Sequence, residues 1–132
     1  MLSEEDSLML KLLLLYTGAG LPVLWGIAHL APTKSVVQGF GEITTDNRHI
    51  ITMEWVVEGV ALILIGTLVG TVTLLDSAGV VSKAVYLICA SGLLVLAMVS
   101  LFTGFKIRFL PFRLCPLVLS VSAFLILLGG LI

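Results

Sequence analysis

Four long apolar segments follow one another along this chain of 132 residues, separated by shorter stretches that hold most of the polar residues. The apolar segments cover about residues 8–30, 50–75, 83–103 and 114–132. Each is close to the roughly 20 residues that a helix needs to cross the hydrocarbon core of a bilayer. None alternates apolar and polar residues for long enough to indicate a strand of a β-barrel. The pattern predicts an all-α fold, a single membrane domain over residues 1–132 whose four transmembrane helices form an up-down bundle.

The composition supports an integral membrane protein. Hydrophobic residues make up 59% of the chain, charged residues make up 11%, and the mean hydropathy is +1.21. Soluble domains contain only about 45–50% apolar residues. The formal net charge of -1 provides no basic surface of the kind that binds nucleic acid. We therefore expect the chain to contact a lipid bilayer and no nucleic acid.

The N-terminal residues are acidic, with Glu4, Glu5 and Asp6 preceding the first apolar segment. A secretory signal peptide would begin with basic residues and end at a cleavage site of small residues. We therefore expect the first segment to be retained as a transmembrane helix.

The two cysteines, Cys89 and Cys115, lie in different apolar segments. With a rise of 1.5 Å per residue, Cys89 lies roughly 20 Å from the end of its helix that is nearest Cys115. A disulfide requires Cα atoms within about 7 Å of each other. The sequence therefore predicts two free thiols.

Two longer connections, residues 31–49 and 104–113, are expected on the same side of the membrane. The first interleaves apolar and polar residues, which indicates a segment that lies at the membrane interface. The second combines Lys106, Arg108 and Arg113 with phenylalanines, a mixture that suits the lipid headgroup layer. It is either a simple interfacial anchor or a specific site for an anionic lipid.

The orientation is predicted from lysine and arginine, which are more frequent in cytoplasmic loops. The two longer connections carry five of these residues and the opposite side carries two. The five are Lys34, Arg48, Lys106, Arg108 and Arg113, and the two are Lys11 and Lys83. The rule predicts a multi-pass protein whose loops 31–49 and 104–113 are cytoplasmic and whose termini both lie outside.

Glu54 and Glu58 lie one helical turn apart at the start of the second apolar segment. Steps of four residues place them on one helix face with Gly66 and Gly70, which form a surface for close helix packing. Charge inside a bilayer is costly, so we expect both to be buried carboxylates that face another helix. His29 ends the first segment, and the loop after it leads directly into the second segment. His29 and the two glutamates are therefore expected at the same membrane surface.

These side chains are compatible with several roles. Carboxylates and imidazoles bind metals, but the spacing matches no carboxylate motif such as Glu-x-x-His, so no metal ligand is assigned. Glu58, Glu54 and His29 are the candidates for acid–base catalysis or proton transfer. A ligand pocket would combine polar groups at one end with aromatic walls, and a purely structural pairing is the remaining interpretation. The candidate ligand-binding residues are Trp25, His29, Arg48, His49, Glu54, Trp55 and Glu58.

Two stretches carry a family resemblance. Residues 18–30 read GAGLPVLWGIAHL and precede a long loop, and residues 58–66 read EGVALILIG. Together with the four-segment layout they resemble the DoxX-like group of small four-helix membrane proteins. The resemblance covers most of the chain in layout but only these two stretches in residues. It implies a compact four-helix bundle that is sometimes an accessory subunit of a quinone-linked membrane oxidoreductase, and it assigns no catalytic residue.

The expected function is that of a binding or accessory module with a polar site at His29, Glu54 and Glu58, which would hold an apolar ligand, a lipid or a partner subunit. The alternative is a small intramembrane enzyme or a proton-coupled transporter in which Glu58 and His29 transfer protons. Because four helices enclose little volume, we expect a homo-oligomer or a subunit of a larger membrane complex. The pattern identifies no cofactor.

Overall fold

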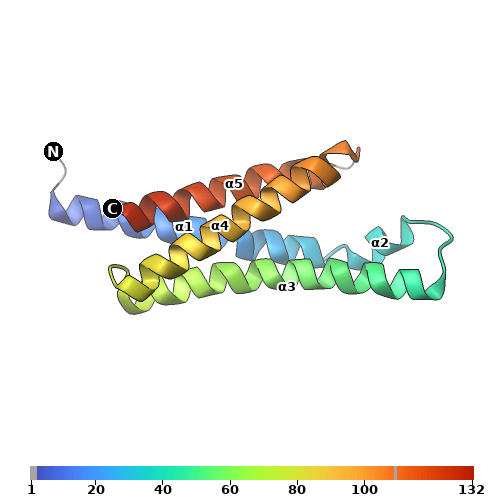
Figure 1. Cartoon of the computed structure of the whole chain (residues 1–132), viewed down its shortest axis with the longest axis horizontal. Helices are drawn as coiled ribbons and strands as arrows, with labels where there is room; N and C mark the ends of the chain where they lie inside the picture. The colour runs from blue at the N-terminus through green and yellow to red at the C-terminus, as the bar shows by residue number, and fades with distance from the viewer. Residues whose placement is uncertain (1–2, 109) are drawn as a thin grey trace.

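A computed structural model describes residues 3–108 and 110–132 of the chain (Figure 1). Its elements are α1 (Glu4–Leu30), α2 (Thr33–Gln38), α3 (Thr45–Asp76), α4 (Val80–Thr103), the 3-10 helix η1 (Gly104–Lys106) and α5 (Leu110–Leu131). Within the described residues there is no strand. Four helical segments, namely α1, α3, α4 with η1, and α5, are long and apolar enough to cross a membrane. The predicted all-α bundle of four transmembrane helices is confirmed.

α1 and α3 begin several residues before the apolar segments that predicted them. The Ser3 side chain accepts a hydrogen bond from the Asp6 amide, and the Asp6 carboxylate accepts one from the Ser3 amide, which forms a capping box. Thr44 Oγ1 likewise accepts from the Asn47 amide at 3.2 Å and caps α3. These first turns are polar, so the hydropathy pattern identified only the apolar part of each helix.

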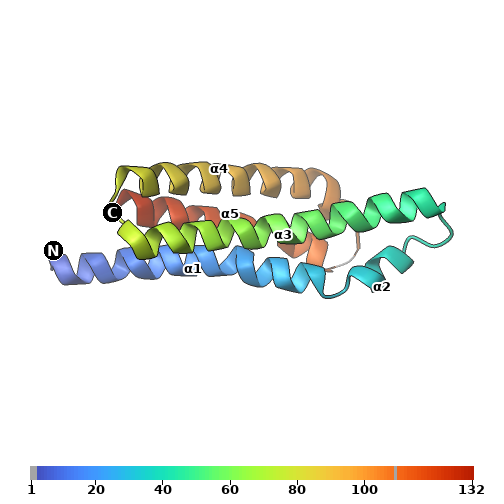
Figure 2. The ribbon, with the colours of Figure 1, turned by 90° about the horizontal axis from the view of Figure 1, so that it is seen from below.

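The spanning helices pack antiparallel, in the order α3, α1, α5, α4 around the bundle. α1 lies between α3 and α5, and α4 packs along α5 (Figures 1 and 2). α3 and α4 are joined by the turn at residues 77–79 and share the smallest of the four interfaces. From this turn α4 leans away from α3, so that the two helices diverge toward the C-terminal end of α4 (Figure 1).

α1 and α3 approach closely because glycines remove side chains from their interface. A Cβ atom at Gly26 would lie 2.6 Å from the Gly59 carbonyl oxygen, and one at Gly66 would collide with the Ala19 carbonyl oxygen. Small residues of this kind let helix backbones meet inside a membrane. The predicted packing role of Gly66 is confirmed. Gly70 is packed more loosely, since a Cβ atom there would lie 4.0 Å from the Ala19 methyl group.

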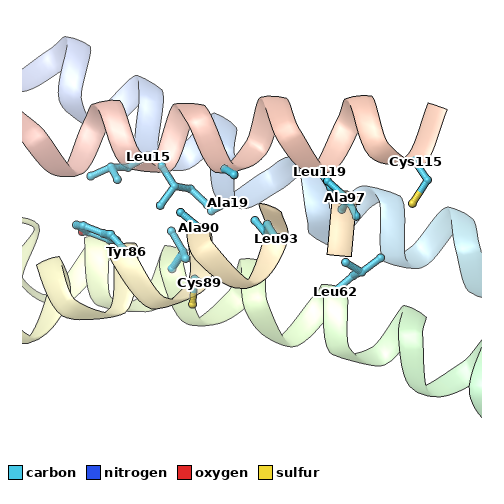
Figure 3. Packing of buried hydrophobic residues seen from close by; sticks show 13 residues of the cluster. Leu15, Ala19, Leu62, Tyr86, Cys89, Ala90, Leu93, Ala97, Cys115 and Leu119 are labelled. Carbon is cyan, nitrogen blue, oxygen red and sulfur yellow. The ribbon is translucent and has the colours of Figure 1, made fainter. Parts of the chain in front are cut away.

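Buried hydrogen bonds connect the helices on other sides of the bundle. Ser122 Oγ of α5 donates to the Gly18 carbonyl of α1 at 2.6 Å, and Thr73 Oγ1 of α3 lies 3.0 Å from the Tyr86 hydroxyl of α4. Both cysteines are free thiols, as predicted. The surrounding core is drawn in Figure 3, where the labelled residues are Leu15, Ala19, Leu62, Tyr86, Cys89, Ala90, Leu93, Ala97, Cys115 and Leu119.

Charged and polar residues mark the same membrane slab on α1 and α3. Gly66 of α3 packs against Ala19 of α1, so the middle of residues 58–76 lies beside the middle of residues 11–29. Lys11 and His29 lie 18 residues apart on α1, and Glu58 and Asp76 lie 18 residues apart on α3. Each interval corresponds to about 27 Å along a helix, close to the roughly 30 Å of a hydrocarbon core. His29 and Glu58 therefore lie near one end of a slab of this thickness, and Lys11 and Asp76 lie near the other.

α3 is longer than this slab. Its 32 residues correspond to about 48 Å, and its N-terminal turns extend past the end of α1 (Figure 2). α2 packs against this extension, with Val37 buried. The connection over residues 31–49 is thus held beside α3 at the membrane surface.

The glycine interface predicts a sharp difference between two alanine substitutions. Gly66→Ala forces a methyl group against the backbone of α1 and should lower the free energy of unfolding by about 1–3 kcal/mol. Gly20→Ala is the matched control, because a Cβ atom there meets nothing within 4 Å, and its effect should be close to zero. Unfolding in mixed detergent micelles measures both, and equal effects of the two substitutions would contradict the interface.

Candidate functional site

The end of α1 is held by hydrogen bonds from two side chains. The last carbonyl groups of a helix have no partner within the helix, and an unpaired carbonyl at a membrane boundary is costly. Trp55 Nε1 of α3 donates to the His29 carbonyl at 2.8 Å, and Thr33 Oγ1 donates to the Leu30 carbonyl at 2.6 Å. Trp55 therefore fixes the end of α1 against α3.

The same tryptophan orients the His29 side chain. The His29 and Trp55 rings stack with their centroids 3.8 Å apart and their planes 15° apart. The edge of Phe112, from α5, meets Trp55 at 5.6 Å between centroids. Three helices thus meet around one indole ring, and this packing leaves only 10% of the His29 side chain exposed.

The imidazole nitrogen Nε2 of His29 faces the Glu58 carboxylate. The distance from Nε2 to Glu58 Oε2 is 3.6 Å, longer than the roughly 2.7–3.2 Å of an N–H···O hydrogen bond. Nε2 is buried and has no hydrogen-bond partner within the described part of the chain. Most buried polar atoms in proteins have such a partner, so this nitrogen requires an explanation.

Glu58 lies on the face of α3 that turns toward α4. Steps of three and four residues connect it with Leu62, Val69 and Val72, and the Val72 carbonyl accepts a hydrogen bond from Ser82 of α4 at 3.3 Å. α4 diverges from α3 toward its C-terminal end (Figure 1), and 44% of the Glu58 side chain is exposed.

Three further residues lie near the site. Cys115, on α5, is buried in the core, and the side chains of Ser100 and Trp25 interact with its thiol. Trp25 packs against the buried core from α1. All four spanning helices therefore contribute to one cluster at the hydrocarbon boundary.

Sequence reasoning missed Ser100, Phe112 and Cys115. All three lie in or next to the connection over residues 104–113, which was predicted at the same membrane surface as His29. The sequence therefore indicated that they lie at a similar depth. It did not indicate their contacts, because it does not show how each helix is rotated toward its neighbours.

The predicted burial of both carboxylates is wrong. Glu54 is exposed and Glu58 is only partly covered. Glu54 lies about 6 Å further along α3 than Glu58, in the part of the helix that extends beyond α1, where no neighbouring span covers it. His49 is also exposed and Arg48 is half-buried, and within the described residues neither forms an ion pair with a carboxylate. The structure thus brings together Trp25, His29, Trp55 and Glu58 and separates Arg48, His49 and Glu54 from them.

Basic residues lie next to the cluster at the same membrane surface. Lys106, Arg108 and Arg113 are all exposed. The Arg113 guanidinium lies 5.5 Å from the centroid of the Phe105 ring, within the range of a cation–π contact. Arg113 directly follows Phe112, whose ring contacts Trp55.

Two hollows on the described surface, of about 300 Å³ beside the turn at residues 77–79 and about 490 Å³ along the start of α1, contain none of the residues of this cluster. No three His, Cys, Asp or Glu side chains in residues 3–108 and 110–132 come together in a way that could hold a metal ion.

Comparisons with known proteins identified no match to this chain among protein families, curated proteins or solved structures.

The double contact of Trp55 predicts a cost for its loss. Trp55→Phe keeps an aromatic ring beside His29 but removes the donor to the His29 carbonyl, and should lower the free energy of unfolding by about 1–3 kcal/mol. Tyr16→Phe is the control, because it removes a polar group from an exposed ring of α1 and should change stability by less than about 0.5 kcal/mol. Unfolding in detergent tests both, and an unchanged Trp55→Phe variant would contradict the capping role.

Proposed function

We propose that this four-span membrane protein is a binding module that holds the polar head of a lipid-like molecule at His29 and Glu58. One observation carries the proposal: a histidine that is nine-tenths buried directs at a half-exposed carboxylate a nitrogen that has no hydrogen-bond partner among residues 3–108 and 110–132. Polar groups at this depth usually serve a ligand, a partner or a proton pathway.

The position of the cluster favours a ligand that comes from the bilayer. The Glu58 side chain is 44% exposed, and α4 diverges from α3 toward its C-terminal end (Figure 1). Cys115 is buried, and Trp25 packs against the buried core. A molecule with a polar head and an apolar tail would place its head at Glu58 and its tail between α3 and α4. The proposed site therefore includes Trp25, His29, Trp55 and Glu58, and excludes the protruding Glu54.

An accessory role in a larger complex is compatible with this proposal. Gly26, Gly59 and Gly66 are used for packing between α1 and α3. A partner subunit would instead cover the divergent side of α3 and α4, where a bound lipid could lie between the two chains. The DoxX-like layout would make such a partner a quinone-linked oxidoreductase.

Acid–base or proton-transfer chemistry is the second candidate. The observation that favours it is the 3.6 Å approach of His29 Nε2 to Glu58 Oε2, since both groups exchange protons readily. In this case Glu58 would be the proton carrier and His29 its partner. Lipid binding and proton transfer require the same residues but predict different experimental results.

Native mass spectrometry of protein purified in mild detergent tests the binding function. The wild type should retain a lipid-like molecule, and Glu58→Gln and His29→Ala should each lower its occupancy at least about tenfold, since a hydrogen bond to a charged group is worth about 1.5–3 kcal/mol. Glu54→Gln is the matched control, because it removes the same charge from the same helix outside the proposed site, and it should retain the molecule.

Two outcomes would reject the binding function. A wild-type protein without any retained molecule is one, and an equal loss in Glu54→Gln is the other. If the empty wild type instead dissipates a pH gradient across liposomes and Glu58→Gln abolishes that flux, proton transfer replaces binding. An anionic phospholipid that remains on the Glu58→Gln variant would belong to the neighbouring basic residues, Lys106, Arg108 and Arg113.

The proposed orientation places loops 31–49 and 104–113 in the cytoplasm. Gln38 and Ala78 are exposed at opposite ends of the bundle, and the native cysteines are buried. A membrane-impermeant maleimide applied to intact cells should label Ala78→Cys at once and label Gln38→Cys only after permeabilisation. The reverse pattern would invert the orientation.

A further inference from the structure

We infer that α3 pairs with α3 of a second copy of this chain, through the face that it turns away from α1, and that the protein is a parallel homodimer in the membrane. The dimer does not depend on the proposed ligand. It gives a role to His49 and Glu54, which both lie outside the candidate site.

The face of α3 opposite its contact with α1 carries an exposed stripe. Its members recur at alternating steps of three and four residues, and all are exposed. They are Ile50, Met53, Val57, Val60, Leu64, Thr67, Thr71 and Leu74, which we call the α3 stripe. Its large apolar side chains are 52% to 76% exposed. Alternating steps of three and four define the a and d positions through which two parallel helices pair, a geometry that membrane helices also use.

The residue types in the α3 stripe suit a pair of helices in the same orientation. The a positions are Ile50, Val57, Leu64 and Thr71, and β-branched residues at a favour two strands in parallel coiled coils. Thr67 is exposed at the midpoint of residues 58–76, deep within the span. In a symmetric parallel pair each residue of the stripe meets its own counterpart, and threonine hydroxyls form hydrogen bonds between membrane helices.

The α3 stripe is longer than the layer of lipid tails. Leu74 lies 24 residues after Ile50, which corresponds to about 36 Å, whereas a hydrocarbon core is roughly 30 Å thick. Asp76 follows closely at the C-terminal end, so the excess lies at the other end. There the first turns of α3 extend past the end of α1 (Figure 2). Ile50 and Met53 therefore lie where lipid tails do not cover them, and a protein partner does.

The charges beside this end of the stripe fit a second copy. His49 and Glu54 are exposed and flank Ile50 and Met53 at the g and e positions, where pairs between the helices of a coiled coil form. A g residue lies beside the e residue five positions further along a parallel partner, so His49 of one copy faces Glu54 of the second copy. The imidazole donates and the carboxylate accepts. Within the described part of its own chain neither side chain has an ion-pair partner.

Cysteine cross-linking in native membranes tests the interface. Val60→Cys should form a disulfide-linked dimer on mild oxidation, because Val60 meets its counterpart at a d position. Ile27→Cys is the matched control and should stay monomeric. Ile27 of α1 is 54% exposed against 52% for Val60, and it lies at a similar depth because Gly26 packs against Gly59. The native cysteines are buried, so the oxidised wild type should also stay monomeric.

A charge swap tests the register of the two helices. His49→Glu places two carboxylates at each contact and should weaken the dimer roughly tenfold, because two symmetry-related attractive contacts become repulsive. Adding Glu54→His to His49→Glu reverses the pair and should restore the wild-type affinity. Energy transfer between donor-labelled and acceptor-labelled copies in liposomes, at a series of protein-to-lipid ratios, measures the dimer fraction of each variant.

Three results would overturn the inference. Val60→Cys that gives no dimer, or no more dimer than Ile27→Cys, excludes this face as an interface between copies. A disulfide from Val60→Cys to a different protein replaces the second copy with another subunit. A double variant as weak as His49→Glu overturns the parallel register and its contact between His49 and Glu54.

Discussion

The close approach of α1 and α3 is the constraint on which the rest of the structure depends. The glycines at this interface leave no room for a methyl group between the two backbones, so the helices have one permitted register. A slip by one residue would move α3 by about 1.5 Å and turn its side chains by about 100°. In the observed register His29 lies opposite Trp55 and Glu58. The arrangement of the polar cluster is thus a consequence of small residues beside it, Gly26 and Gly59, and of Gly66 about 12 Å away along α3.

Trp55 turns this register into a defined site. Its indole donates to the His29 carbonyl and at the same time stacks on the His29 ring. The hydrogen bond satisfies a carbonyl that a helix end would otherwise leave unpaired, and the stack fixes the direction of the imidazole. The stability of the α1 terminus and the orientation of the candidate ligand-binding group are therefore coupled through one side chain. The Glu58 carboxylate that faces this imidazole remains 44% exposed.

The depth of each polar residue could be predicted from the sequence, but its surroundings could not. Hydropathy located the four spans, and the interval from Glu58 to Asp76 already matches the thickness of a hydrocarbon core. Counting residues along α3 in the same way places Glu54 outside the hydrocarbon core. Its exposure could therefore have been predicted from the length of the helix, although the helix face that it shares with Glu58 and Gly66 suggested burial. The interactions of Cys115 with Ser100 and Trp25 depend on how α4 and α5 are rotated, and a helix that is apolar all round does not specify that rotation.

The His29–Glu58 pair is difficult to explain as a structural contact alone. The α1–α3 interface is already held by glycine packing and by the Trp55 hydrogen bond, so the pair adds little that this interface lacks. Apolar side chains of similar size often replace a buried ion pair without loss of stability. A pair kept for stability would also be expected at hydrogen-bond distance, whereas Nε2 and Oε2 are 3.6 Å apart and Nε2 has no hydrogen-bond partner in the described part of the chain. The ligand proposed for this site would have to supply the hydrogen-bond partner that Nε2 lacks among the described residues.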